Sequence, residues 1–325
     1  MPSLKTYMRT LPKQDTKPDR KNIILADIYA SRKEESPGIE GNIPLTFSLI
    51  RRTYTELLRG NNVVWILNRQ GEAQEVYCQG CGHVLKCEKC GSVMRSINDG
   101  NMLKCRLCGS LRELPQKCPE CGRVFFRGRR PGLEALAKII TPYYPKVRLY
   151  VKGARKSSMR GLVLSTNRVI EILGDIKPSL VAWLDWDAEL RDDDYDSRYR
   201  AFSRLYESYY TGRESDSTRK VLVQSRREGR RLAEYLASGW ERYCEEELRQ
   251  REEFMLPPCG YMIELDTRGK IPRETLIDSL EDNGLFVMDP GDESQPVFVN
   301  VQSLDEVMQT IEPYAQELTI TVRSE

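Results

Sequence analysis

Eight of the ten cysteines lie between Cys78 and Cys121, and they form four Cys-x-x-Cys pairs, each followed directly by glycine. The pairs are Cys78/Cys81, Cys87/Cys90, Cys105/Cys108 and Cys118/Cys121. Two intervening residues allow both thiolates of a pair to bind one ion from a tight turn, and the glycine suits the positive φ that such a turn needs. Four thiolates close a tetrahedral structural zinc site with no position left for water. The spacing therefore predicts two four-cysteine zinc sites.

Disulfides and an iron–sulfur cluster are the alternatives for cysteines in this number. The N-terminus, Met1 to Lys21, lacks the apolar stretch of a secretory signal, and paired thiols in an intracellular chain usually bind metal. Iron–sulfur clusters usually take their thiolates from a different spacing. Zinc is therefore the favoured interpretation of the four pairs.

The four pairs can be grouped into two sites in three ways. The first two pairs are separated only by Gly82 to Lys86, which makes a site shared between them awkward. Nesting is easier: an inner hairpin would be closed by Cys87, Cys90, Cys105 and Cys108, and the outer site would be made by Cys78, Cys81, Cys118 and Cys121. The only histidine, His83, lies among these ligands and is expected to be a spectator.

The composition fits a soluble globular protein with room for two or three domains. The chain has 325 residues, a formal net charge of +2 and a hydrophobic share of 40%. No apolar run reaches the length of a membrane span. We therefore expect a cytoplasmic protein with no membrane partner.

Positive charge is concentrated between Arg123 and Arg160, where Glu134 is the only carboxylate. Such a stretch can neutralise phosphates of a nucleic acid, although a solvated face is the alternative, as is a contact with the acidic stretch Asp185 to Asp196. The candidate nucleic-acid contacts are Arg69, Arg127, Arg129, Arg130, Arg155 and Lys156.

Outside the cysteine segment, short apolar runs alternate with helical patterns. Strands are expected at Ile23–Ile28, Val63–Leu67, Val124–Phe126, Val147–Val151, Leu162–Leu164, Leu180–Leu184 and Val221–Gln224. Helices are expected at Pro44–Leu58, Leu133–Ile140 and Arg198–Tyr210. Strands with little polar alternation, separated by helices, predict a parallel sheet covered on both faces. The cysteine segment is then an insertion that leaves from the end of one strand.

The C-terminal part begins with a long, highly charged helical stretch, predicted over Arg226 to Phe254 and ended by Leu256–Pro258. A strand–helix–strand–strand–helix–strand pattern from Met262 to Val322 then predicts a small α+β domain of split βαβ type. Cys244 and Cys259 lie outside the four pairs and are expected to be ordinary thiols.

The order, spacing and flanks of the four pairs resemble those of the primosomal replication-restart helicase family (PriA). Asn68-Arg69-Gln70-Gly71-Glu72-Ala73 precedes them where the family has Asn-Arg-Arg-Gly-Tyr-Ala, and Cys118-Pro119-Glu120-Cys121-Gly122 matches the family's Cys-Pro-x-Cys-Gly. The resemblance covers the chain from about Asn22 to the end. It implies a superfamily 2 helicase whose second RecA-like lobe carries the zinc insertion, with the nested metal grouping. In that family the zinc module contacts branched DNA and primosome partners.

The chain departs from this family in the parts that hydrolyse ATP. It has no Gly-x-x-x-x-Gly-Lys-Ser/Thr phosphate loop and no Asp-Glu-x-His segment, both of which belong to the family's first lobe. The family's arginine motif corresponds to Tyr209 to Asp216, in which Arg213 is a vestigial nucleotide-binding residue. Asp216 takes the place of the second arginine, and its carboxylate would repel phosphate. We therefore expect no catalytic residues and no ATP as cofactor.

Other remnants of the family's second lobe are Gly174-Asp175 and the pair Asp185 and Asp187, for which a solvated acidic loop is the alternative. Nearby aromatic residues could stack on bases, but packing in a core or interface is the favoured role. They are Trp183, Trp186, Tyr206, Tyr209 and Tyr210.

The predicted fold class is α/β: a single RecA-like parallel sheet, a helicase second lobe, carries an inserted two-zinc ribbon module and precedes a small α+β C-terminal domain. The parts are a disordered basic tail (1–21), the first part of the lobe (22–74), the two-zinc insertion (75–123), the second part of the lobe (124–226) and a helical linker with the C-terminal domain (227–325).

Three functions remain open. The leading hypothesis is a truncated PriA-like zinc protein of replication restart that binds forked or single-stranded DNA, or primosome proteins, without hydrolysing ATP. The alternative is half of a split or truncated ATP-dependent 3'-5' DNA helicase whose first lobe is a separate polypeptide. The third is a pure interaction module in which zinc staples the fold and DNA plays no part.

Overall fold

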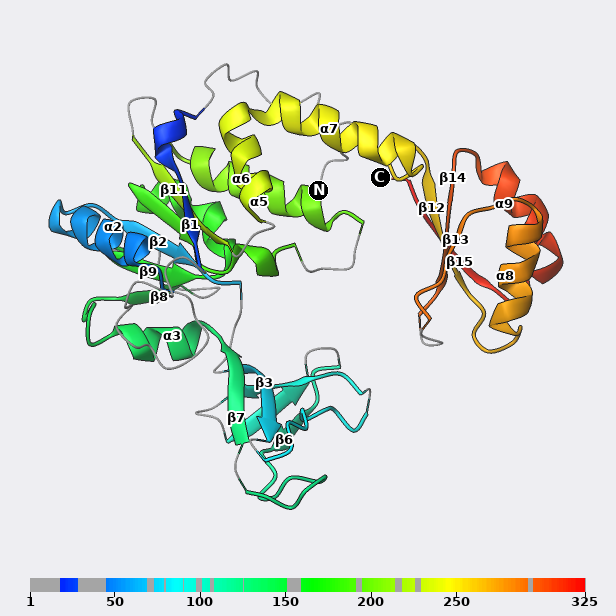
Figure 1. Ribbon diagram of the computed structural model, residues 1–325, viewed down its shortest axis with the longest axis horizontal. Coiled ribbons are helices and arrows are strands. Elements are labelled where there is room, and N and C mark those ends of the chain that lie inside the picture. The colour runs from blue at the N-terminus through cyan, green and yellow to red at the C-terminus, as the bar shows by residue number, and fades with distance from the viewer. Residues whose placement is uncertain are drawn as a thin grey trace. The chain divides into compact units, whose positions relative to one another are not determined.

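The computed structural model describes residues 18–28, 45–68, 73–78, 80–89, 91–97, 101–105, 108–124, 126–150, 159–190, 195–213, 218–225, 229–291 and 295–324. The described chain forms two compact units, 18–237 and 238–325 (Figure 1). Most of the predicted basic tail, up to Lys17, lies outside the described residues. Among the described helices, none is both long and apolar enough to cross a lipid bilayer.

A six-stranded parallel sheet forms the centre of the first unit and confirms the predicted α/β class. Its strands are β1 (Ile23–Asp27), β2 (Val63–Ile66), β8 (Arg148–Tyr150), β9 (Leu162–Ser165), β10 (Leu180–Trp183) and β11 (Lys220–Ser225). Their order is β1-β11-β10-β2-β9-β8, and every pairing is parallel. All four residues of β2, β9 and β10 are buried, which explains their continuous apolar runs.

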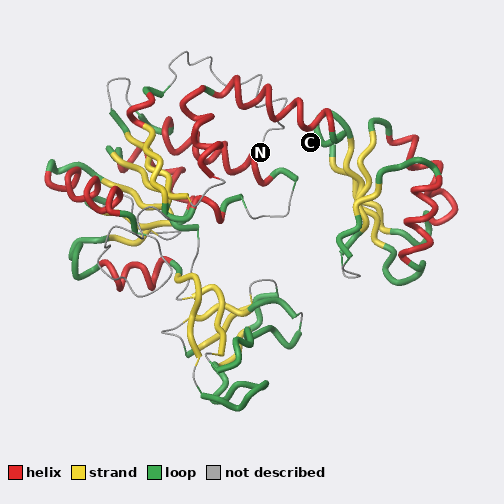
Figure 2. Tube along the Cα trace, in the orientation of Figure 1, coloured by secondary structure: helices red, strands yellow, loops and turns green. Residues whose placement is uncertain are grey.

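Two helices, α2 (Phe47–Leu58) and α3 (Leu133–Ile140), pack against one face of this sheet, with Leu49 and Leu136 in the shared core (Figure 2). Helix α2 begins later than predicted because the Thr46 side chain caps it by accepting from the Leu49 N–H at 3.2 Å.

Helix α5 (Ser197–Tyr210) reaches the opposite face, where Trp183 of β10 donates its Nε1–H to Ser208 Oγ at 3.2 Å. A 3-10 helix, η5 (Asn167–Ile172), leads into the short α4 (Leu173–Ile176), and α6 (Gly229–Ser238) follows β11.

The cysteine segment forms a separate antiparallel sheet of five strands. They are β3 (Ala73–Cys78), β4 (Met94–Ile97), β5 (Met102–Cys105), β6 (Leu111–Glu113) and β7 (Phe126–Pro131), in the order β6-β5-β4-β3-β7. The predicted strand Val124–Phe126 of the parallel sheet was wrong. The strand begins at Phe126 and pairs with β3, from Cys78↔Phe126 to Ala73↔Pro131. Its charged sequence is tolerated because β7 is an edge strand.

The second unit starts with α7 (Trp240–Glu253) and contains a four-stranded antiparallel sheet with two helices. Its elements are β12 (Tyr261–Asp266), α8 (Arg273–Asp282), β13 (Val287–Met288), β14 (Val297–Val301), α9 (Leu304–Ile311) and β15 (Thr319–Arg323). The order β13-β14-β12-β15 confirms the predicted small α+β arrangement. The helical stretch predicted from Arg226 to Phe254 is divided into two helices, because Gly239, at φ 95°, separates α6 from α7.

Candidate metal centre

All four cysteine pairs fold into the same turn. The first cysteine of each pair donates its backbone N–H to the carbonyl five residues later, at 2.8 Å in every case; the bonds are Cys78→His83, Cys87→Ser92, Cys105→Ser110 and Cys118→Arg123. The glycine after each pair has a φ between 71° and 78°. Because glycine adopts this region without strain, the turn depends on its position in the motif. The prediction from the four glycines is confirmed.

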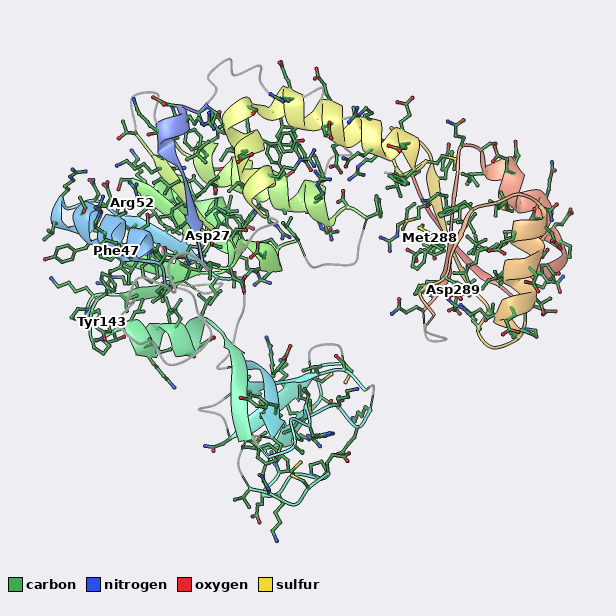
Figure 3. The ribbon with its side chains drawn as sticks, viewed as in Figure 1. Asp27, Phe47, Arg52, Tyr143, Met288 and Asp289 are labelled. Atoms are coloured by element: carbon green, nitrogen blue, oxygen red, sulfur yellow. The ribbon has the colours of Figure 1, made fainter. Side chains whose placement is uncertain are left out.

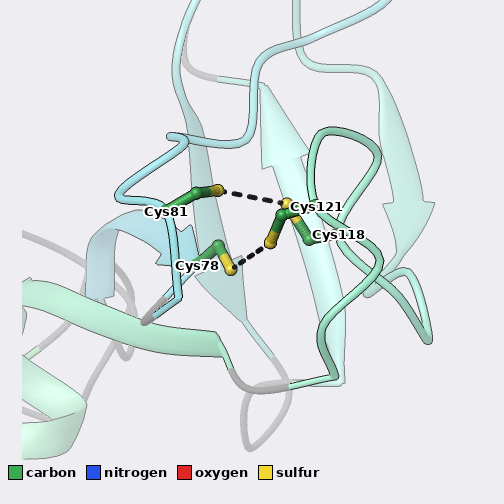
Figure 4. A group of neighbouring side chains, drawn as sticks. All are labelled: Cys78, Cys81, Cys118 and Cys121. Carbon is green, nitrogen blue, oxygen red and sulfur yellow. Dashed lines mark hydrogen bonds between the residues drawn. The ribbon is translucent and has the colours of Figure 1, made fainter.

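The outer cluster unites the first and fourth pairs. The Sγ atoms of Cys78, Cys81, Cys118 and Cys121 all lie within 4.8 Å of one another. Cys78 Sγ is 3.6 Å from Cys121 Sγ, and Cys81 Sγ is 3.7 Å from Cys118 Sγ (Figure 4). A tetrahedral zinc ion with its usual Zn–S distance separates its sulfurs by roughly 3.8 Å. The cluster therefore has the size that a four-thiolate zinc site requires.

Two thiols of this cluster, Cys78 and Cys81, differ in how easily they ionise. Burial opposes ionisation of Cys78, but the N–H groups of Cys81 and Gly80 and the neighbouring thiols outweigh it and lower its pKa to about 7. The N–H of His83 favours the Cys81 thiolate, yet burial and the neighbouring thiols outweigh it and raise its pKa to about 12. The Cys78 thiolate thus forms readily while that of Cys81 is resisted, and a cation bound beside them would favour the thiolate form of both.

Two further contacts connect the first and fourth turns. A Cβ atom at Gly80 would lie 2.3 Å from Arg123 Cδ, so the Arg123 side chain passes directly over the first turn. His83 Nδ1 lies 3.7 Å from Glu120 Oε1. The metal-sized groups found among the described residues contain cysteines only, so His83 is outside both of them.

The inner cluster contains Cys87, Cys105 and Cys108, whose Sγ atoms also lie within 4.8 Å of one another. Cys87 Sγ is 3.6 Å from Cys108 Sγ. Cys90, the predicted fourth ligand, lies outside the described residues. The structure thus brings together the residues of the nested grouping, as far as it describes them.

Ser110 is a residue that the sequence did not single out. Its Oγ lies 3.1 Å from Cys87 Sγ and 3.2 Å from Cys108 Sγ, so its hydroxyl can donate a hydrogen bond to a thiolate of the inner cluster. Such outer contacts orient ligands and adjust metal affinity. In the sequence alone, a serine two residues after a Cys-x-x-Cys pair does not indicate a contact with the cysteine sulfurs.

The burial of the cysteines alternates within each described pair. The first member is buried in Cys78, Cys87, Cys105 and Cys118, and the second is exposed in Cys81, Cys108 and Cys121. None of the nine described cysteines forms a disulfide. Among the described residues, both clusters are therefore groups of free thiols that could hold a metal ion.

The predicted nucleic-acid contacts fall into two groups. Arg127, Arg129 and Arg130 lie on β7, where Arg127 and Arg129 are paired with Tyr77 and Glu75 of β3. The remaining three lie outside the described residues: Arg69, Arg155 and Lys156.

Arg213, predicted to be a vestigial nucleotide-binding residue, lies over an aromatic ring. Its guanidinium carbon is 4.7 Å from the centre of the Tyr209 ring and 5.9 Å from that of Tyr210. Tyr209 is buried in the lobe, and Tyr206 and Tyr210 are half-buried, with ring centres 4.3 Å apart. Trp183 and Trp186 are also buried and pack edge to face at 5.0 Å.

The solvated acidic loop that was the alternative prediction for Asp185 and Asp187 is not what the structure has. Both residues are buried, and Ser225 donates its hydroxyl to Asp187 Oδ1 at 2.5 Å. Glu189 is buried as well; burial raises its pKa, although Arg204 donates to it at 3.0 Å and opposes the change. These carboxylates therefore belong to the packed interior at the ends of the strands.

Comparisons with known proteins point to one group. The chain is 25% identical over 242 residues to the replication restart protein PriA of Thermotoga maritima, a match covering 70% of this chain and 32% of the relative. It is 25% identical to the Haemophilus influenzae protein of that name over 67% of this chain, and 23% identical to that of Bacillus subtilis over 66%. The matched region spans about a third of the length of these relatives. No protein-family model matches the chain.

Proposed function

We propose that this chain, a partial relative of the replication restart proteins PriA, is a zinc-bearing part of the replication restart machinery that binds DNA or a replication protein in the cytoplasm and does not itself hydrolyse ATP. In this proposal the parallel sheet is a RecA-like second lobe and the antiparallel sheet is a ribbon that holds two zinc ions.

The observation that carries the proposal is the outer cysteine cluster. Its four thiols come from two turns whose cysteines Cys81 and Cys118 are 37 residues apart in the sequence, and all four Sγ atoms lie within 4.8 Å of one another. The core beneath them is small; its buried residues are Val76, Leu85, Cys87, Met94, Leu103 and Cys105. A sheet with so small a core needs an additional source of stability, which bound zinc supplies.

The DNA part of the proposal rests on the positive charge at and after β7. This strand carries three arginines, and the described residues Lys146, Arg148 and Arg160 beyond it are exposed. Each cation that meets a phosphate releases a counterion, so the affinity would depend strongly on salt.

The proposed absence of ATP hydrolysis rests on motifs that this sequence lacks. It holds neither a phosphate loop nor an Asp-Glu-x-His segment, and Arg213 stacks on Tyr209. In the alternative, a split helicase, a separate polypeptide would supply the first lobe, and the complex of the two would hydrolyse ATP.

Forked-DNA binding with metal analysis tests the proposal. The wild type is expected to carry two zinc ions per chain and to bind forked DNA with an affinity that falls at least tenfold between 50 and 200 mM salt. The variant Cys87→Ser/Cys90→Ser should lose about one ion and weaken DNA binding. Cys259→Ser, which removes a thiol outside both clusters, is the matched control and should change neither value.

Three results would contradict the proposal. If the purified chain contains no metal, the two zinc sites on which the proposal depends do not exist. Full metal content with DNA binding that does not change with salt argues for the pure interaction module. ATP hydrolysis by the purified chain, stimulated by DNA and unaffected by removal of contaminants, would show an enzyme.

A further inference from the structure

Helix α2 presents an apolar stripe on the side that faces away from the sheet. Phe47 is 56% exposed, Tyr54 58% and Leu58 71%, although all three are large hydrophobic residues. Figure 3 labels Phe47 and Arg52 on this helix. Together the three side chains expose on the order of 400 Å², a size that on monomers often marks a functional surface.

The stripe has a regular spacing. Phe47, Arg51, Tyr54 and Leu58 are separated by four, three and four residues, and all four are exposed. This spacing places them in one line along a helix, which is the pattern of a seam between two helices packed in a left-handed pair. The inner face of α2 is already used, since Leu49, Thr53 and Glu56 are buried in the lobe.

The stripe stays in place because α2 is anchored at three points. Thr46 caps its start, Thr53 accepts from Trp65 Nε1 at 2.9 Å, and Glu56 accepts from Ser179 at 2.9 Å near its end. A partner would therefore meet a surface that does not have to be ordered on binding, which lowers the entropic cost of association.

The charge around the stripe has one sign. Arg51 and Arg59 are exposed, whereas Glu56, the only carboxylate of the helix, is buried and is held by Asn61, Ser179 and Lys220. A partner that covers the apolar stripe would therefore bring the least repulsion if it carried negative charge beside its own apolar residues.

We propose that the outer face of α2 is a docking surface for an acidic amphipathic helix of another protein. The partner helix would place leucine-like side chains against Phe47, Tyr54 and Leu58, with glutamate or aspartate beside Arg51 and Arg59. This surface is separate from the cysteine clusters and lies on the parallel sheet.

Two other occupants fit the surface less well. A second copy of this chain, joined through the same face, would bring Arg51 and Arg59 of two helices together, and the stripe supplies only about half of the roughly 800 Å² per partner that stable interfaces bury. DNA would use the arginines but gain little from Leu58, since a phosphate backbone offers no apolar surface in exchange for its burial.

A designed peptide supplies the test. The probe is a fluorescent three-heptad peptide with leucine at the two seam positions and glutamate at the flanking positions; a second peptide has lysine in place of glutamate. By fluorescence anisotropy, the full chain is expected to bind the acidic peptide with Kd on the order of 10 µM and the basic peptide at least tenfold more weakly.

The substitutions Tyr54→Ser and Leu58→Ser should each weaken binding of the acidic peptide tenfold or more, because both remove buried contact area while leaving the core of the lobe intact. Arg51→Glu should reverse the preference and favour the basic peptide. The control is Phe286→Ser, an equally exposed aromatic at 63% in the second unit, which should leave binding unchanged.

Several outcomes overturn the proposal. They are no saturable binding of the acidic peptide, equal loss in Phe286→Ser, and retained binding in Tyr54→Ser and Leu58→Ser with circular dichroism like that of the wild type. Displacement of the peptide by forked DNA assigns the stripe to nucleic acid. A dimer of the free chain that Leu58→Ser abolishes in sedimentation assigns it to a second copy.

Discussion

Gly212 and Gly174 touch backbone to backbone at the turn that carries Arg213. A Cβ atom at Gly212 would lie 2.1 Å from the Cα atom of Gly174, and Gly212 has a φ of 62°. Two requirements therefore coincide at one residue: positive φ, and space that only a hydrogen atom can occupy. A side chain at Gly212 would therefore disturb the contact between these two turns.

Substitution Gly212→Ala should destabilise the first unit by about 2–4 kcal/mol, because it adds a backbone clash to the cost of positive φ. Urea unfolding followed by tryptophan fluorescence measures the change. Gly60→Ala is the matched control: Gly60 has a φ of 78°, but nothing lies within 4 Å of its Cβ position, so only about 1 kcal/mol is expected. Equal costs at both positions would show that the contact with Gly174 is unimportant.

Ser110→Ala should weaken zinc binding at the inner cluster roughly tenfold, since it removes a hydroxyl that lies within hydrogen-bonding distance of two thiolates. Competition with a chromophoric chelator, at fixed pH, gives the affinity of each site. Ser92→Ala changes the residue at the matching place in the second turn and serves as the control. If the two alanine variants release zinc alike, the hydroxyl of Ser110 has no role at the metal.

Some features of single residues could be predicted from the sequence, and others could not. The positive φ of Gly82, Gly91, Gly109 and Gly122 follows from a local motif and could be predicted. The position of Ser110 beside Cys87 depends on chain segments 23 residues apart that meet only in the fold. The same holds for Asp187, whose burial depends on a hydroxyl from Ser225, 38 residues away.

At the scale of elements, Glu56 connects α2 to two strands of the parallel sheet. Its carboxylate accepts from Asn61 at 2.8 Å, from Ser179 just before β10 at 2.9 Å and from Lys220 of β11 at 3.1 Å. Burial opposes its ionisation, but these hydrogen bonds and the charge of Lys220 outweigh burial and lower the pKa of Glu56. The charged form is therefore the one that stabilises the fold.

Replacement Glu56→Gln should reduce the free energy of unfolding at pH 7 by about 1–3 kcal/mol. Because the folded-state pKa is below the unfolded one, this contribution is present above roughly pH 4.3 and is lost as the pH falls through the folded-state pKa. Urea unfolding at pH 7 and at low pH should thus show a difference between the two proteins that shrinks on acidification. Glu281→Gln, at an exposed position, should show no such trend. A difference that stays constant with pH would contradict the charged role of Glu56.

The elements that could be predicted are those with long apolar runs or strong helical periodicity. Strands β2, β9 and β10 were found because they are buried throughout. Strand β7 was misplaced because its sequence, Phe126–Pro131, is mostly arginine and glycine and has no apolar period to detect. The break between α6 and α7 was missed because a single glycine in a helical pattern is usually tolerated, whereas Gly239 adopts φ 95°.

At the scale of the whole molecule, the parts differ in what stabilises them. The core under α2 and α3 contains sixteen buried residues, counted from Ala26 to Leu222, whereas the core of the cysteine sheet contains six, from Val76 to Cys105. Two of those six are themselves cysteines of the inner cluster. We expect the larger core to support its sheet alone and the smaller one to need the metal that we propose its cysteines bind.

Removal of zinc by a strong chelator should therefore unfold the cysteine sheet and leave the parallel sheet folded. Hydrogen exchange is the measurement: amides of Val76 and Leu103 should lose protection while those of Val181 and Val221 keep it. Returning zinc should restore the protection of the first pair. Loss of protection in both sheets would mean that the metal sites hold the entire first unit together.

The pairing of β3 with β7 also bears on how such a protein can change over evolution. The segment between them begins at Ala73 and ends at Pro131, and these two residues face each other across one ladder. Neighbouring strands lie about 5 Å apart, so the entire segment begins and ends at almost the same point in space. A gene could gain, lose or exchange that segment in one event, because a short hairpin turn would reconnect the chain without moving either end. The geometry would thus let the cysteine sheet be gained or lost while the strands of the parallel sheet keep their places.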